Sequence, residues 1–301
     1  MECAVQCPLV MFGKILCPID FSAPSQAALR VAARLAQSTG SELVLAHAFH
    51  FPAVAAAHET SLPGKTLQLL MNDEKRGLEV AKEDARRYGA DKVTTEFLDG
   101  SPGHVISDLA ANGFDLIVVG TAGRTGLKRF MIGSVAENIV RHAPTSVLVV
   151  RGNPDGPYFD HVLCPVDFSE DSPRVLERAE QLAQPGGTGL DLVHAIELPL
   201  AASGDPLLVD FVTDADRLAT NQLESLAEQV RDRKRANVRS EVLTGHPAEI
   251  ILAKAEEDRT IDLIAVGTHG RTGIRRLLLG SVAEKLVRHA PCSVLVVRGR
   301  R

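Results

Sequence analysis

The chain has 301 residues, a formal net charge of −5, 45% hydrophobic residues and 24% charged residues. This composition is typical of folded globular proteins, and the acidic excess argues against a dedicated nucleic-acid binder. The longest apolar runs, such as Leu116 to Val119, are far shorter than the roughly 18 residues that a membrane helix needs. We therefore expect no membrane and no nucleic-acid partner, although a small anion could bind locally.

The amino terminus and the cysteines favour a cytoplasmic protein. Residues 1–11 lack the basic segment of a signal peptide, so we interpret them as a tail, and Met11 could be the natural start. The five cysteines are an odd number without CxxC spacing, and Cys17 and Cys164 take equivalent places in two predicted strands. Buried, reduced thiols are the main interpretation, and a metal or redox role for Cys3 and Cys7 is the alternative.

The sequence contains an internal duplication. Lys14–Ser22 recurs as His161–Ser169, and Gly120–Gly152 recurs as Gly267–Gly299, in both cases 147 residues later. This period is too long for a solenoid unit and indicates two copies of one domain. The predicted layout is a tail at 1–11, a first domain at 12–151, a linker of turn-forming residues at 152–158 and a second domain at 159–301.

Short apolar runs alternate with amphipathic segments in each copy, which is typical of a parallel sheet covered by helices on both faces. In the first copy the predicted strands are Lys14–Pro18, Glu42–Phe49, Val93–Leu98, Leu116–Gly120 and Ser146–Val150. The helices between them should begin near Ser25 with Ser22 as cap, around Lys65, at Pro102 and at Ser134. The predicted fold is α/β, with two tandem doubly wound domains, each a five-stranded parallel sheet flanked by helices, related by a pseudo-twofold axis.

A glycine-rich loop follows the fourth predicted strand of each copy and leads into a helix. The first copy has Gly120-x-x-Gly123, nine residues, then Gly133-Ser134, and the second has Gly267-x-x-Gly270, nine residues, then Gly280-Ser281. Glycines let backbone N–H groups approach an oxyanion, and the helix adds its positive dipole end. Because open α/β sheets bind ligands at the carboxyl ends of their strands, the loops predict two phosphate sites. The alternative is that the glycines serve only as turn residues.

The loops also carry basic residues, which are Arg124, Lys128 and Arg129 in the first copy and Arg271, Arg275 and Arg276 in the second. On an acidic protein, such local clusters favour an anionic ligand. Their other interpretation is a solvated charged face.

These motifs resemble those of a known family. Gly-Thr-His-Gly-Arg-Thr-Gly, then Leu-Gly-Ser-Val-Ala-Glu, then Ala-Pro-Cys-Ser-Val-Leu-Val-Val is similar to the universal stress protein family in its tandem two-domain form. The resemblance extends from Phe12 to Arg298. It implies a five-stranded parallel sheet in each domain and, in the family's ATP-binding branch, ATP with Mg²⁺ held by a G-2x-G-9x-G-[ST] motif that both copies match.

The resemblance also implies a set of site residues. Ribose and phosphates would lie against Gly120, Gly123, Gly133, Ser134 and Val135 in the first copy, and against Gly267, Gly270, Gly280, Ser281 and Val282 in the second. The adenine and ribose would lie beside Pro18, Asp20 and Ala48, and beside Pro165, Asp167 and Ala195. The family often has a larger aliphatic residue where Ala48 and Ala195 stand. Asp20 and Asp167 have an alternative interpretation as helix-capping residues.

No nucleophile is indicated by a known motif, and neither loop offers an evident base: the segment from Thr121 to Ile132 contains no Asp, Glu or His, and the second loop adds only His269. No carboxylate cluster obviously holds a metal either. We therefore expect an ATP-binding stress-response or regulatory protein with little or no turnover, built as an intrachain pseudo-dimer that could dimerise further. The alternatives are a slow ATPase or autophosphorylating protein, with Ser134 and Ser281 or a neighbouring Thr as acceptors, and an interaction protein that binds no nucleotide.

Overall fold

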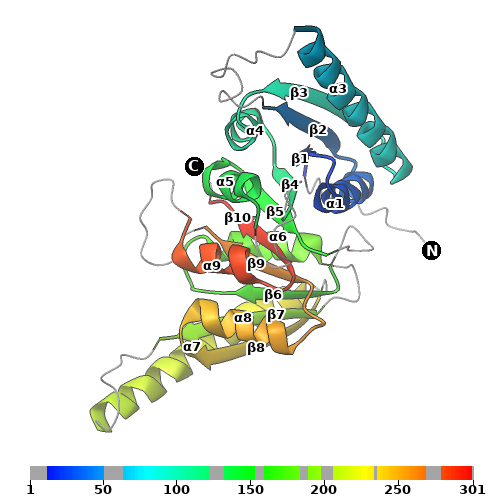
Figure 1. The fold of residues 1–301 in the computed structure, drawn as a ribbon. Coiled ribbons are helices and arrows are strands. Elements are labelled where there is room, and N and C mark those ends of the chain that lie inside the picture. The colour runs from blue at the N-terminus through cyan, green and yellow to red at the C-terminus, as the bar shows by residue number, and fades with distance from the viewer. Residues whose placement is uncertain are drawn as a thin grey trace, which may run out of the picture. The chain divides into compact units, whose positions relative to one another are not determined.

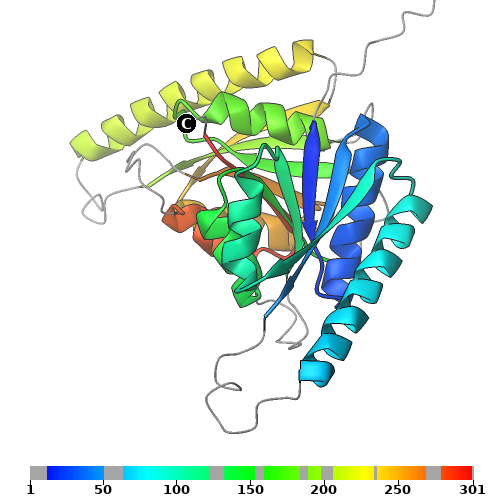
Figure 2. The same cartoon turned by 90° about the horizontal axis from the view of Figure 1, so that it is seen from above.

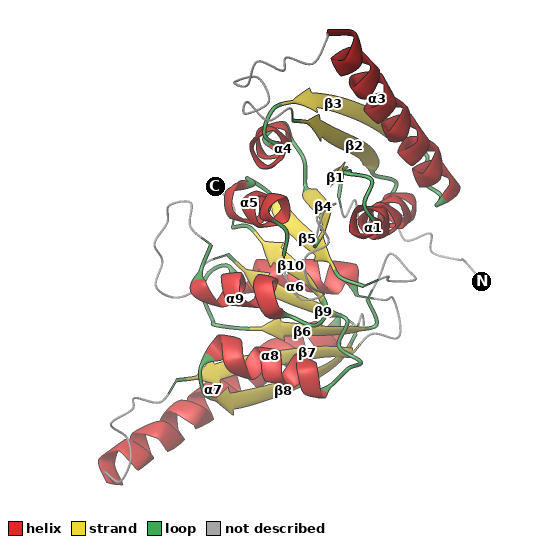
Figure 3. Ribbon diagram, viewed as in Figure 1, coloured by secondary structure: helices red, strands yellow, loops and turns green. Residues whose placement is uncertain are grey.

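The computed structural model describes residues 12–50, 64–121, 132–152, 159–183, 189–197, 206–233, 236–268 and 279–299, which are coloured by secondary structure in Figure 3. The chain forms two compact units, one mainly from residues up to 157 and the other mainly from residues 158 onward. No helix in the described ranges is long and apolar enough to cross a membrane. The predicted pseudo-twofold relation between the copies stays a prediction.

The first unit has a parallel sheet with the strand order β3-β2-β1-β4-β5. Its strands are β1 (Lys14–Pro18), β2 (Glu42–Phe49), β3 (Val93–Asp99), β4 (Leu116–Gly120) and β5 (Ser146–Val150). Its helices are α1 (Ala23–Thr39), α3 (Gly64–Arg87), α4 (Pro102–Ala110) and α5 (Ser134–His142). Helices α1 and α3 cover one face of the sheet, and α4 and α5 cover the other (Figures 1 and 2).

The second unit repeats this fold with the order β8-β7-β6-β9-β10, again all parallel. Its strands are β6 (His161–Pro165), β7 (Gly189–Ile196), β8 (Asn237–Thr244), β9 (Leu263–Gly267) and β10 (Ser293–Val297). Its helices are α6 (Ser172–Leu182), α7 (Pro206–Asp232), α8 (Pro247–Glu257) and α9 (Ser281–His289). The predicted α/β fold of two tandem, doubly wound domains is confirmed, and the winding direction reverses between β6 and β9.

The central strands lie inside the core, and their composition explains why. Ile15, Leu16 and Cys17 of β1 are fully buried, as are Leu116 and Ile117 of β4. Such continuous apolar runs are expected of strands that are covered by helices on both faces. Burial raises the pKa of the Cys17 thiol above its usual range and that of Cys164 to about 12. The predicted burial of these two thiols is confirmed, while Cys3 and Cys7 lie outside the described residues.

The starts of the first helices differ between the units. In the first unit Ser22 caps α1, as predicted, and its hydroxyl accepts a hydrogen bond from the Ser25 amide at 3.4 Å. Helix α6 begins two residues later relative to the repeat, with Asp171 at the cap position. Because Pro is favoured in the first helical turn, the shift from Pro24 in α1 to Pro173 in α6 accounts for the later start.

Candidate functional site

A pocket of about 700 Å³ opens at the carboxyl edge of the second unit's sheet. The ends of β6, β7 and β9, the first turns of α6, α8 and α9, and one side of α7 line it. Small-molecule sites commonly have volumes of roughly 300–1,000 Å³. The pocket also spans the point between β6 and β9 where the winding reverses, which is where open α/β sheets bind their ligands.

This pocket collects the predicted site residues of the second copy. Those that line it are Pro165, Asp167, Ala195, Gly267, Gly280, Ser281 and Val282. Gly270 and the basic residues Arg271, Arg275 and Arg276 lie outside the described residues. The fold thus brings predicted site residues from four separate segments to one pocket. That Arg271, Arg275 and Arg276 help to bind the ligand stays a prediction.

The equivalent residues of the first unit lie at the same edge of its own sheet. Pro18 ends β1, Ala48 lies near the end of β2, and Gly120 ends β4. Gly133 is the cap of α5, which Ser134 and Val135 begin. Gly123 falls outside the described residues, as do Arg124, Lys128 and Arg129.

Both glycine-rich loops are closed at their base by a backbone hydrogen bond. The Gly280 amide donates to the Thr268 carbonyl at 2.9 Å, and the Gly133 amide donates to the Thr121 carbonyl. A Cβ atom on Gly280 would lie 3.0 Å from the Thr268 oxygen, so a side chain would press on this closure. The first amides of α5 and α9 have no partner within their helices, and such amides bind anions.

Gly120 has a packing reason to lack a side chain. A Cβ atom at this position would lie only 2.5 Å from the carbonyl oxygen of Pro24, where α1 packs against β4. The close approach of the two backbones therefore explains the glycine without any ligand. At this position the structure favours the structural interpretation over a phosphate contact.

Asp20 and Asp167 are fixed by hydrogen bonds within their own turns. The Oδ1 atom of Asp20 accepts from the Ser22 amide at 3.0 Å and from the Ser22 hydroxyl at 2.6 Å. Asp167 makes the same two contacts with Ser169, at 3.0 and 2.6 Å, and also accepts from the Ser172 hydroxyl at 2.8 Å. Each carboxylate is therefore held in place by an Asx-type turn before any ligand is considered.

A phenylalanine with an unusual backbone conformation follows each of these aspartates. Phe21 has a φ of 64° and Phe168 a φ of 56°. Bulky residues rarely adopt this left-handed region, and such strain is concentrated at functional sites. Phe168 lines the pocket, so the turn that fixes Asp167 also directs an aromatic ring toward it.

Several residues of the pocket were not indicated by the motifs. Asp171 and Glu197 add carboxylates. His194, whose place near the end of a strand predicts a core or pocket-edge histidine, adds an imidazole. The wall formed by α7 consists of Ala215, Leu218, Ala219 and Gln222. The apolar spacing of α7 predicts which of its sides packs on the sheet, but not that this side also forms a pocket wall.

The described residues contain no group of three or more His, Cys, Asp or Glu side chains placed to hold a metal ion. Mg²⁺ is commonly bound by one or two carboxylates together with substrate phosphates and water. Asp167, Asp171 and Glu197 line the pocket and offer such carboxylates. The arrangement thus fits a metal that arrives with its ligand.

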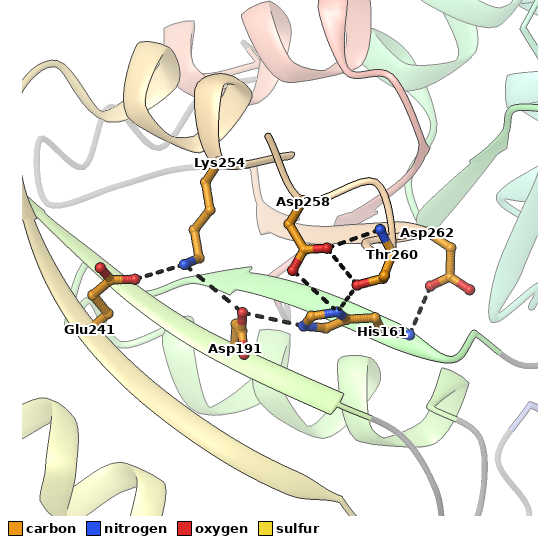
Figure 4. Close-up of polar contacts among 7 residues, drawn as sticks. All are labelled: His161, Asp191, Glu241, Lys254, Asp258, Thr260 and Asp262. Carbon is orange, nitrogen blue, oxygen red and sulfur yellow. Dashed lines mark hydrogen bonds and ion pairs between the residues drawn. The ribbon is translucent and has the colours of Figure 1, made fainter. Parts of the chain in front are cut away.

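A second polar cluster lies at the opposite, amino-terminal edge of the same sheet (Figure 4). His161 on β6 has its Nε2 atom 3.2 Å from Asp191 Oδ2 and its Nδ1 atom 2.7 Å from Thr260 Oγ1. Figure 4 shows Lys254 reaching from α8 toward this group, with its Nζ atom 4.0 Å from Asp191 Oδ2 and 2.7 Å from Glu241 Oε2. The cluster borders a separate hollow of about 400 Å³, which shares no lining residue with the larger pocket.

Comparisons with known proteins agree with this fold. The profile of the universal stress protein family matches residues 11–151 and 159–298. The chain is 29% identical over 298 residues to a universal stress protein of Mycolicibacterium smegmatis, which covers 95% of this chain and 97% of that protein. It is 35% identical over 144 residues to universal stress protein A homolog 1 of Coxiella burnetii, covering 46% of this chain and 96% of that protein.

Among solved structures, the fold is similar to that of a universal stress protein from Archaeoglobus fulgidus. The TM-score is 0.68 at 22% sequence identity, and the match covers 96% of both chains. Together with the two family matches, this shows that the chain belongs to the universal stress protein family and carries two copies of its domain.

Proposed function

We propose that this protein binds an adenine nucleotide in each unit and acts as a stress-response regulator with little or no turnover. The observation that carries the proposal is the 700 Å³ pocket of the second unit. Seven positions assigned from separate motifs line this single hollow, although they are spread over more than a hundred residues of sequence. The same motif residues lie at the same edge of the first unit.

The pocket has two ends of different chemistry. At one end the amino terminus of α9, with Gly280 and Ser281, supplies backbone amides and a hydroxyl for phosphates. At the other end β6 and β7 supply an aromatic ring, an imidazole and small aliphatic side chains, which suit a nucleoside. This polarity follows from the strand order, because β6 and then β7 follow β9 across the sheet.

Low turnover is supported by the placement of the carboxylates. Phosphoryl transfer needs a positioned acceptor, a base and an electrostatic clamp on the transferred group. Among the described residues, α9 and its cap contribute Gly280, Ser281, Val282 and Ala283 to the pocket, none of which is a base. The carboxylate of Asp171, beside Gly299 after β10, is an acidic group on this side of the pocket. The carboxylate of Asp167 is held at the β6 end by its own turn.

The proposal is tested by mass spectrometry of small molecules released from the purified, denatured protein. An adenine nucleotide present at up to two per chain is the expected result. Gly280→Leu should lower the amount released, because its side chain would press on the loop closure, whereas Ala111→Leu, at the exposed end of α4, should not. Release of no nucleotide, together with no uptake of added ATP, contradicts the proposal.

Turnover is measured separately as phosphate release with ATP and Mg²⁺. We expect a rate far below the roughly 1–100 per second of kinases. A rate within that range, or transfer of label from the γ-phosphate to Ser134 or Ser281, would instead support the ATPase or autophosphorylation alternative.

A further inference from the structure

Equivalent histidines lie near the carboxyl edge of the two sheets, His47 on β2 and His194 on β7. They are 5% and 7% exposed. Each ring packs against the phenylalanine of the strained turn, with centroid distances of 4.8 Å to Phe21 and 4.5 Å to Phe168. The imidazole therefore has the same aromatic neighbour in both units.

The same ring nitrogen is fixed in both units. The Nδ1 atom of His47 lies 2.7 Å from the carbonyl oxygen of Ile19, and that of His194 lies 2.6 Å from the carbonyl oxygen of Val166. A carbonyl oxygen can only accept, so Nδ1 must carry the hydrogen. In a neutral imidazole the Nε2 atom is then a hydrogen-bond acceptor.

The units differ in what meets this acceptor. In the first unit Glu74 of α3 places its Oε2 atom 2.9 Å from His47 Nε2. Because the carboxylate oxygen and the imidazole nitrogen are both acceptors, a proton must lie between them at this distance. The Nε2 atom of His47 is therefore already hydrogen-bonded to Glu74. The pair is closely enclosed, because the side chains of His47 and Glu74 are only 7% and 21% exposed.

In the second unit an alanine replaces this glutamate. The two helices align through a shared contact with the neighbouring strand, since Thr95 bonds to Glu79 in one unit and Ser240 to Glu224 in the other. The same shift of 145 residues places Ala219 of α7 where α3 has Glu74. Ala219 and His194 both line the pocket.

The Nε2 atom of His194 is consequently available to a ligand. No hydrogen bond or ion pair to it is formed by the residues that the structure describes, and it is not among the fully buried polar atoms that lack a partner. It lies on β7, which is the end of the pocket away from α9. A nucleotide with its phosphates at α9 would carry its base toward this end.

We propose that His194 is a specificity-determining residue of the second site, which accepts a hydrogen bond from the amino group of adenine and thereby disfavours guanine. Adenine presents an N–H donor at the position where guanine presents an oxygen acceptor. The guanine oxygen would face the lone pair of His194 Nε2, and neither of these two acceptors would then have a donor. In the first unit Glu74 is bonded to His47 Nε2, so we expect the first site not to discriminate between adenine and guanine in this way. The inference rests on the nucleotide binding proposed above.

The test compares ATP and GTP by calorimetric titration of the full chain and of two reciprocal variants. In the unmodified protein we expect the second site to prefer ATP by about tenfold or more, as one discriminating base contact commonly does, and the first site to discriminate less. Ala219→Glu should remove the preference of the second site. Glu74→Ala should create one in the first, with the fold of this variant checked by circular dichroism.

Ser225→Glu is the matched control, because Ser225 is exposed on the same helix and does not line the pocket. It should leave both ratios unchanged. Equal ATP and GTP affinities at both sites, or ratios that neither reciprocal variant shifts, would overturn the assignment of His194 while leaving nucleotide binding in place. If neither ATP nor GTP binds, both proposals are overturned.

Discussion

Replacing Asp191 with valine should stabilise the second unit. Asp191 lies in the middle of β7, paired with Leu163 of β6. The equivalent position of the first unit is Val44 of β2, paired with Leu16 of β1. The same fold therefore accommodates a valine at this point, so Asp191→Val introduces a side chain of similar size that suits a buried strand.

The size of the effect follows from the surroundings of Asp191. The residue is 5% exposed, and its Oδ1 atom is buried without a partner in the part of the chain that the structure describes. An unsatisfied buried acceptor costs about 1–3 kcal/mol. Lys254 keeps Glu241 at 2.7 Å and His161 Nδ1 keeps Thr260 at 2.7 Å, but the buried Nε2 atom of His161 loses its contact with Asp191 Oδ2 at 3.2 Å. Removing the unsatisfied acceptor should contribute about 1–3 kcal/mol. Because His161 loses a partner, we expect the net gain to be smaller, about 1 kcal/mol.

The assay is urea unfolding of the full chain followed by circular dichroism. Val44→Asp is the reciprocal variant. It buries a carboxylate in the first unit, where Leu109 stands at the position equivalent to Lys254 and offers no charge to pair with it. We expect it to lower the free energy of unfolding by about 3–5 kcal/mol. A loss of more than about 1 kcal/mol for Asp191→Val would refute the reasoning. It would mean that the attraction of His161 and Lys254 outweighs the desolvation of Asp191.

Three further predictions concern the cores and turns. Gly120→Ala should destabilise the first unit by about 1–3 kcal/mol, since its Cβ would lie 2.5 Å from the Pro24 carbonyl oxygen; an unchanged urea midpoint would contradict this. Cys17 and Cys164 should resist iodoacetamide at pH 8 in the folded protein and react in urea, because burial raises their pKa values and suppresses the thiolate; peptide mass mapping decides. Ser22→Ala should cost about 1 kcal/mol in the same unfolding assay, through the lost cap of α1, and a neutral result would show that the cap is dispensable.

Most of the fold could be predicted because strands and loops have local signatures. Four of the five predicted strands of the first unit end where the structure ends them, and the strand predicted at Val93–Leu98 extends by one residue to Asp99. Continuous apolar runs mark buried parallel strands, and Pro102 and Gly133 mark helix starts. The later start of α6 is also readable from the position of Pro173 once the two copies are compared.

The candidate site was predicted only where motifs are local. The turn after β6 and the start of α9 could be located from the residues themselves, such as Asp167 and Ser281. The α7 wall could not, because the apolar spacing of a helix predicts its buried side but not which pocket that side borders, which depends on packing. The different environments of His47 and His194 depend on the same packing, since Glu74 and Ala219 reach them from distant helices.

The most direct test of the account is calorimetric titration of ATP into the full chain after any bound molecule has been removed. We expect two ATP molecules per chain, reduced to one by Gly280→Leu and to none when Gly133→Leu is added, with circular dichroism showing that both variants keep their fold. No detectable binding to the unmodified protein, or full binding by the double variant, would contradict the central claim that each unit holds a nucleotide at its glycine-rich loop.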